Sequence, residues 1–128
     1  MDKSQVPRDF CKQILELDKT IRFAGIADKF GKMVMTAYRK GTTSLLSKHE
    51  SVLSVMQSSI RMGTRKTMQP QLGKIVYTFT VYEKVKRASI PLHNFAVLMV
   101  SFDPESDHET LILKKILPLV KKHGLHRD

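Results

Sequence analysis

The stretch "IRFAGIADKFGKMVMTAYRKG", residues 21–41, decides the fold, because it holds two strand-like runs joined by a tight turn. Residues 21–28 and 32–38 alternate with a period of two, which is typical of β-strands. Between them, "DKFG" places Asp28 at the entry of the turn and Gly31 where a positive φ is expected. The sequence therefore predicts a β-hairpin whose turn helps to set the register of the two strands.

A helix is predicted on each side of this hairpin. Before it, Phe10, Ile14 and Leu17 recur at helical spacing. After the loop at 39–44, a second helix is predicted over residues 44–68. Its apolar positions form a helical stripe, which consists of Leu45, Leu46, Val52, Leu53, Met56 and Ile60 and extends toward Gly63.

Three more strands are predicted downstream, over residues 73–82, 85–92 and 94–102. Pro91 cannot donate to a sheet ladder, so it belongs at the end of the second of these strands. The strand 94–102 is apolar on both faces, which indicates a central position covered on both sides. We therefore expect Ala96 and the residues that follow it to be buried.

The last predicted helix begins near Ser106, which forms a capping-box pattern with Glu109. Gly124 suits the position just after its C-terminus. Pro118 lies inside the helical pattern, where it removes a hydrogen bond, so we expect a kink or break there.

The resulting element order is α-β-β-α-β-β-β-α within one predicted domain, residues 1–128. Short connections favour antiparallel neighbours, so the fold class is α+β, a single sheet with helices on both faces. The sequence has neither a signal-peptide pattern nor a run of about 20 apolar residues, so we expect a soluble, cytoplasmic protein.

The net charge of +10 is unevenly distributed along this basic protein. Residues 29–82 hold nine Lys and Arg and one acid, Glu50, whereas residues 88–113 hold four acids and no Lys or Arg. Such asymmetry favours an acidic or polyanionic partner, although general solubility explains it as well.

The basic residues are the better candidates for a binding site. The predicted partner-binding residues are Arg61, Arg65, Lys66, Lys74, Lys84, Lys86 and Arg87. Arginine grips phosphate or carboxylate with two prongs, and the nearby Tyr77, Phe79 and Tyr82 could stack on bases. The alternative is that these aromatic residues belong to the core and that the charges form a solvated face or protect a sheet edge.

Other chemistry is weakly indicated. The sequence has no nucleotide-binding or metalloprotease motif, so we expect no enzyme activity and no cofactor. Its one cysteine, Cys11, lies in a helical apolar pattern and is interpreted as a buried side chain rather than a nucleophile. The acidic stretch 103–109 could bind a hard cation, but it lacks the spacing of a calcium loop and suits a helix N-terminus better.

The element order, with the "GIADKFGKMV" hairpin after an entry helix, resembles the roadblock/LC7 (dynein-light-chain-7) family of profilin-like and longin-like folds. The chain also looks like a family of small archaeal proteins with no assigned activity. The roadblock resemblance implies the sheet order 2-1-5-4-3, with one helix on one face and two on the other. It also implies a homodimer, paired through helix 44–68 or the edge strand 73–82, that acts as a scaffold or a regulator of small Ras-like GTPases.

This sequence departs from the family pattern at "RMGTRK", residues 61–66, because positive charge at the helix end would repel a symmetry mate unless those ends lie far apart. Two hypotheses follow, a roadblock-type protein-interaction module and, alternatively, a polyanion binder of nucleic acid or acidic protein that uses the basic segment 29–87. A small-ligand sensor is known among profilin-like folds, but nothing in the sequence argues for one.

Overall fold

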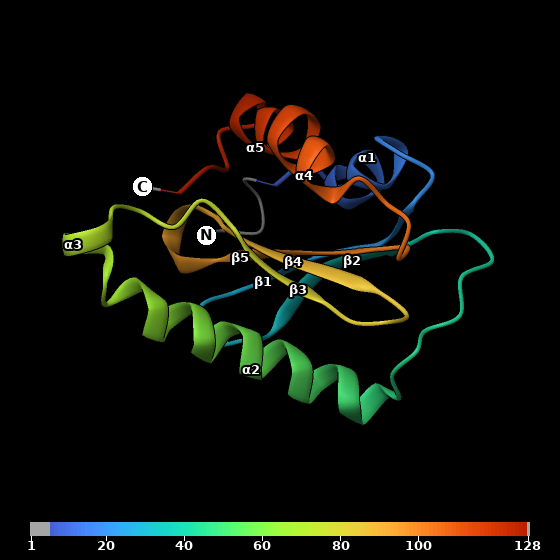
Figure 1. The fold of residues 1–128 in the computed structure, drawn as a ribbon, viewed down its shortest axis with the longest axis horizontal. Helices are drawn as coiled ribbons and strands as arrows, with labels where there is room; N and C mark the ends of the chain where they lie inside the picture. Colours follow the sequence, from blue (N-terminus) through green and yellow to red (C-terminus); the bar gives the residue numbers. More distant parts are fainter. Residues whose placement is uncertain (1–5, 128) are drawn as a thin grey trace.

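The computed structural model describes residues 6–127 and contains one five-stranded antiparallel sheet (Figure 1). The strands are β1 (Ile21–Ala27), β2 (Met33–Tyr38), β3 (Thr78–Val81), β4 (Lys86–Pro91) and β5 (Val97–Phe102). Their order across the sheet is β2-β1-β5-β4-β3, which confirms the predicted topology. The β5 strand lies at the centre, next to β1, and Ala96 and Leu98 are buried as predicted.

The helices divide between the two faces of the sheet. They are α1 (Phe10–Glu16), α2 (Lys48–Lys66), the short α3 (Gln69–Leu72), α4 (His108–Leu111) and α5 (Leu117–Lys122). Figure 1 shows α1, α4 and α5 on one side of the sheet and α2 on the other. The larger core lies under α1 and α5, where Phe10, Ile14 and Ile116 pack against Ile26 and Leu98.

The hairpin of β1 and β2 forms as predicted. The Gly31 N–H donates to the Asp28 carbonyl, and the Asp28 side chain accepts from the N–H groups of Phe30 and Lys32. Gly31 has φ of +80°, a conformation that side chains disfavour. A β-bulge near Ala27 shifts the register at the end of the hairpin.

Two predicted strands begin several residues later in the structure. The strand predicted over 73–82 begins only at Thr78, because the Ile75 N–H donates to the Gln69 side chain instead of to the sheet. Continuing the register would also set Val76 opposite Pro91, which has no N–H to donate. The strand predicted over 94–102 begins at Val97, after a 3₁₀ turn at His93–Phe95.

Helix boundaries also differ from the prediction. Helix α2 begins at Lys48 rather than Ser44, and Ser47 and Glu50 form its capping box. The capping box predicted for Ser106 is wrong, because Asp107 caps α4 by accepting from Thr110 N–H. Ser106 is buried instead, and its hydroxyl accepts from that of Thr20.

The chain stays helical through Pro118, where a kink or break was predicted, but the helix is irregular just before this residue. A π-helical segment at Ile112–Ile116 separates α4 from α5, and Pro118 lies in the first turn of α5. A π segment commonly absorbs such an irregularity within a helix. The predicted interpretation of Cys11 is confirmed, because its side chain is buried in α1 and burial raises the pKa of the thiol to about 12.

Candidate functional site

Helix α2 forms an apolar core with the sheet mainly near one end of the strands, and Met99 and Phe23 extend this core inward. Directly paired residues of three neighbouring strands form an apolar row there. The members of this row are Met33, Ala27 and Val97. Val55 and Met62 of α2 join the same buried cluster, which forms the small second core of the protein.

The rest of the sheet face toward α2 is largely polar. Two adjacent rows of directly paired residues cross all five strands there. In order from β2 to β3, the first row is Thr36, Gly25, Met99, Ser89 and Thr78. The second row is Tyr38, Phe23, Ser101, Arg87 and Thr80. A sheet face covered by a helix is ordinarily apolar, because polar groups lose hydration when they are covered.

Helix α2 turns its polar side toward this face and its apolar side toward solvent. Ser54 and Ser58 lie on the inner side, and Ser58 is buried. Part of the apolar stripe predicted from the sequence is exposed, since Leu53 is 44% exposed, Met56 45% and Ile60 67%. Val52 borders the groove, and Leu45 and Leu46 lie in the loop before α2. Over this polar part of the sheet the helix is therefore inverted, and the side chains of Leu53, Met56 and Ile60 stay largely exposed within residues 6–127.

A groove of about 790 Å³ lies between α2, the two polar rows and the loop that joins β2 to α2. Its lining contains seven basic residues and a single acid, Glu83. The basic residues are Arg22, Lys32, Lys48, Arg61, Arg65, Lys84 and Arg87. The volume falls within the roughly 300–1,000 Å³ of typical small-molecule sites, so the groove is a candidate binding site with strong positive charge.

Two arginines of the groove donate to serine hydroxyls of α2, Arg87 from the sheet and Arg61 from within the helix itself. Arg87, on β4, donates a hydrogen bond to the Ser54 hydroxyl on α2. Arg61, on α2, donates to the Ser58 hydroxyl over 3.2 Å. Each guanidinium is thus oriented by a neutral hydroxyl, and each keeps further N–H donors for another partner.

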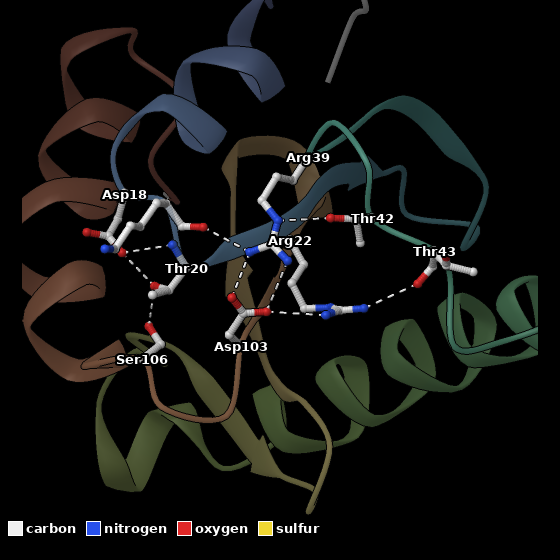
Figure 2. A network of polar contacts seen from close by, with 9 residues as sticks. Asp18, Thr20, Arg22, Arg39, Thr42, Thr43, Asp103 and Ser106 are labelled. Atoms are coloured by element: carbon white, nitrogen blue, oxygen red, sulfur yellow. Dashed lines mark hydrogen bonds and ion pairs between the residues drawn. The ribbon is translucent and has the colours of Figure 1, made fainter.

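The loop beside the groove is held by Asp103, which follows β5 (Figure 2). Arg39 donates two hydrogen bonds to this carboxylate, from Nη1 to Oδ2 over 2.7 Å and from Nη2 to Oδ1 over 3.2 Å. Arg22 Nη1 also lies 3.2 Å from Oδ1. The same two arginines bind the loop, since Arg39 Nε donates to the Thr42 hydroxyl and Arg22 Nη2 donates to the Thr43 carbonyl.

The electrostatics of this network follow from the two arginines. The hydrogen bond from Arg39 lowers the pKa of Asp103 below its ordinary value, partial desolvation opposes that shift, and Arg22 lowers the pKa further. The same hydrogen bond raises the pKa of Arg39. Asp103 therefore stays ionised at neutral pH and holds the loop between β2 and α2 in place.

The acidic stretch 103–109 does not form a cation site. Asp103 binds the two arginines and Asp107 caps α4, so these carboxylates serve different local structures. Across residues 6–127, we find no group of three or more His, Cys, Asp or Glu side chains placed to hold a metal ion. Within the same range, none of the helices has the length and apolarity needed to cross a membrane.

The structure separates the seven predicted partner-binding residues. Four of them line the groove, namely Arg61, Arg65, Lys84 and Arg87. Lys66 lies at the end of α2 with its Nζ 5.0 Å from the ring centre of Phe95, and Lys74 lies on the exposed segment before β3. Lys86 points to the other side of the sheet, where its Nζ donates to the Ser106 carbonyl over 2.8 Å. This division does not favour a single surface made of all seven.

The three aromatic candidates also divide between the core and the groove. Tyr77 and Phe79 pack against the larger core, and Phe79 stacks on the His108 ring at 3.8 Å, so the interpretation of these two as core residues is confirmed. Tyr82 is exposed and lines the groove.

Comparison with known proteins identifies this architecture among solved structures. No protein-family model matches the sequence, and no curated protein matches it either. Among solved structures, a roadblock/LC7 domain from Streptomyces avermitilis superposes with a TM-score of 0.69 at 11% identity, over 91% of this chain and 92% of that one. The chain has the roadblock/LC7 fold.

Two further structures share it. The gliding protein MglB from Thermus thermophilus matches with a TM-score of 0.67 at 13% identity, over 97% of this chain and 85% of that one. An MglB with a tetrameric arrangement matches with a TM-score of 0.65 at 14% identity, over 91% and 77% of the two chains. The resemblance found in the sequence is thus supported at the level of the fold.

Proposed function

We propose that this chain is a non-enzymatic protein-interaction module of the roadblock type. In this proposal it forms a homodimer and serves, in the cytoplasm, as a scaffold or regulator of a small Ras-like GTPase. The observation that carries the proposal is the inversion of α2, which presents an apolar stripe to solvent.

The outer side of α2 is a suitable surface for a second copy. Leu53 and Met56 are 44% and 45% exposed beside the still more exposed Ile60, so the stripe is continuous along this part of the helix. Contiguous exposed apolar surface of this kind marks interaction sites, since leaving it in water is unfavourable. An antiparallel pairing of two α2 helices also keeps their basic C-terminal ends apart and sets Arg65 nearer to the partner's N-terminal turn.

The edge strand β3 offers a second surface. It is the last strand in the sheet order, so one side of its backbone is free to pair with another strand. Val81 on this strand is 64% exposed. The tetrameric arrangement of an MglB with the same fold supports assembly through copies of the chain.

The test of dimerisation is light scattering of purified protein across a concentration range, with the variant Ile60→Glu. We expect the native chain to be a dimer at about 10–100 µM and the variant to be a monomer, because a buried unpaired carboxylate is costly. Since Ile60 is exposed within one chain, the variant should still fold. Leu113→Glu, on an exposed site of the opposite helical layer, is the matched control and should remain dimeric. A native chain that is monomeric at 100 µM would refute this part of the proposal.

The GTPase part rests on the fold resemblance and needs its own experiment. Immobilised chain is exposed to purified small Ras-like GTPases of the source organism, each loaded with GDP or with a non-hydrolysable GTP analogue. Saturable binding that depends on the loaded nucleotide supports a regulator, and binding without such dependence supports a scaffold. If no GTPase binds at micromolar concentration while the chain is dimeric, the regulator and scaffold roles both fail and the homodimer proposal survives.

A further inference from the structure

We propose that the groove between α2 and the sheet binds a small phosphorylated molecule that carries a planar ring, which is the chemistry of a nucleotide. This inference goes beyond the proposed function, because it concerns the inner side of α2 whereas dimerisation uses the outer side.

The polar floor of the groove is the first argument. Hydroxyl side chains from every layer of the site converge there, and they are Thr36, Thr78, Thr80, Ser89 and Ser101 on the sheet and Ser51, Ser54 and Ser58 on the helix. An apolar filling would hold α2 on the sheet more tightly, since burial of apolar side chains drives such packing. Hydroxyls contribute little to that packing, but they donate readily to phosphate oxygens.

The second argument is the placement of uncompensated positive charge. Arg61 and Arg87 reach the groove from opposite sides, one from the helix and the other from the sheet. The ion pairs found within residues 6–127 join Arg22 and Arg39 to Asp103, and neither involves these two arginines. A phosphate between them could accept paired hydrogen bonds from each guanidinium, the geometry for which arginine is suited.

The third argument concerns the ring. Phe23 and Tyr38 lie at the other end of the row that contains Arg87, with their ring centres 4.8 Å apart. Tyr38 is 54% exposed and lines the groove, so one face of this aromatic pair is accessible to a ligand. Stacking on such a pair stabilises a nucleobase without selecting its identity.

The size of the site favours a mononucleotide over a bare phosphate ion. From β4, which carries Arg87, to β2, which carries Tyr38, there are three strand spacings, or about 14 Å. A ligand that contacts both ends must therefore be extended, with phosphate at one end and the ring at the other. The volume of about 790 Å³ accommodates one such molecule.

The experiment is isothermal titration of the full chain with ATP, adenosine and tripolyphosphate at low salt. We expect ATP to bind at micromolar to low-millimolar Kd and adenosine to bind at least tenfold more weakly. Arg61→Gln and Arg87→Gln should each weaken ATP binding by about tenfold or more, because each removes charge-assisted hydrogen bonds. Arg65→Gln removes another positive charge that lines the groove. Arg65 is exposed, so a folding defect is not expected in this variant.

Further variants separate the ring from the phosphate and the groove from the dimer. Tyr38→Ala should weaken ATP binding several-fold and leave tripolyphosphate binding unchanged. Lys114→Gln and Lys121→Gln, on exposed sites of the opposite layer, should bind ATP like the native chain. Ile60→Glu should also retain ATP binding, so a failure of dimerisation does not imitate a failure of the ligand site.

Three results would overturn the proposal. The first is no heat of binding at several millimolar ATP, and the second is an equal loss of affinity in the arginine and lysine variants. The third is displacement of ATP by a single-stranded oligonucleotide at far lower concentration, which would identify the groove as a nucleic-acid site instead.

Discussion

Replacing Asp103 with Asn is expected to lower the free energy of unfolding by about 1–3 kcal/mol. The carboxylate accepts two hydrogen bonds from Arg39 and lies 3.2 Å from a nitrogen of Arg22. Asparagine keeps one acceptor oxygen, but its NH₂ group faces a guanidinium and its negative charge is gone. The side chains of Arg22 and Asp103 are 18% and 17% exposed, so solvent screens the pair only in part.

The pH dependence of this loss has a definite sign. The pKa of Asp103 is lowered in the folded protein, chiefly by the hydrogen bond from Arg39. Its contribution to stability is therefore complete above the ordinary pKa of 3.8 and is lost as the pH falls through the lowered value. The difference between native chain and Asp103→Asn should be full at pH 7 and should shrink below about pH 4.

Thermal unfolding followed by circular dichroism at pH 7 and at acidic pH measures both effects. A loss of about 2 kcal/mol corresponds to a decrease in Tm on the order of 6–10 °C for a chain of this size. Glu16→Gln, an exposed acid on α1, is the control and should change Tm by little. A decrease below about 1 °C at pH 7, or a decrease that is the same at both pH values, would refute the role given to the network.

Two further predictions concern other positions. Burial and the nearby Lys86 lower the pKa of His108, and the Lys86 Nζ lies 3.4 Å from the His108 Nδ1. The native chain should therefore lose stability as the pH falls below the ordinary pKa of 6.5. In urea titrations, His108→Gln should remove much of that loss. Gly31→Ala should destabilise by about 1–2 kcal/mol, since φ is +80° and an added Cβ would lie 3.3 Å from the Met56 backbone. Gly63→Ala in α2, where an added Cβ meets nothing within 4 Å, should instead stabilise by about 0.4–1 kcal/mol, and equal signs for the two glycines would contradict this reasoning.

The sheet could be predicted from the sequence because its signals are local or nearly so. The turn at Asp28 and Gly31 sets the first hairpin, and the two-sided apolarity of residues 97–100 places β5 between covered faces. The boundaries that failed depend on distant partners. Residues 74–77 alternate like a strand, but the register of β4 brings Pro91 into the ladder at that point.

The site was less accessible to sequence reasoning. Periodicity shows that α2 has an apolar side, but it does not show what covers that side. The second periodicity, of Ser51, Ser54 and Ser58, was the available signal for the inner polar face. The convergence of Arg61 and Arg87 requires the pairing of β4 with β5, which brings residues far apart in the chain to one groove.

The inversion of α2 also determines how firmly this helix is held. Of its 19 residues only Val55, Ser58 and Met62 are buried, so most of its backbone hydrogen bonds are separated from water by little more than their own side chains. Its amides should therefore exchange their hydrogens with solvent at a lower opening free energy than those of β1 and β5, where neighbouring strands and two layers of side chains protect the backbone. Helix α2 carries both proposed binding surfaces. It is also the helix that can detach from the sheet with the least disturbance of the main core.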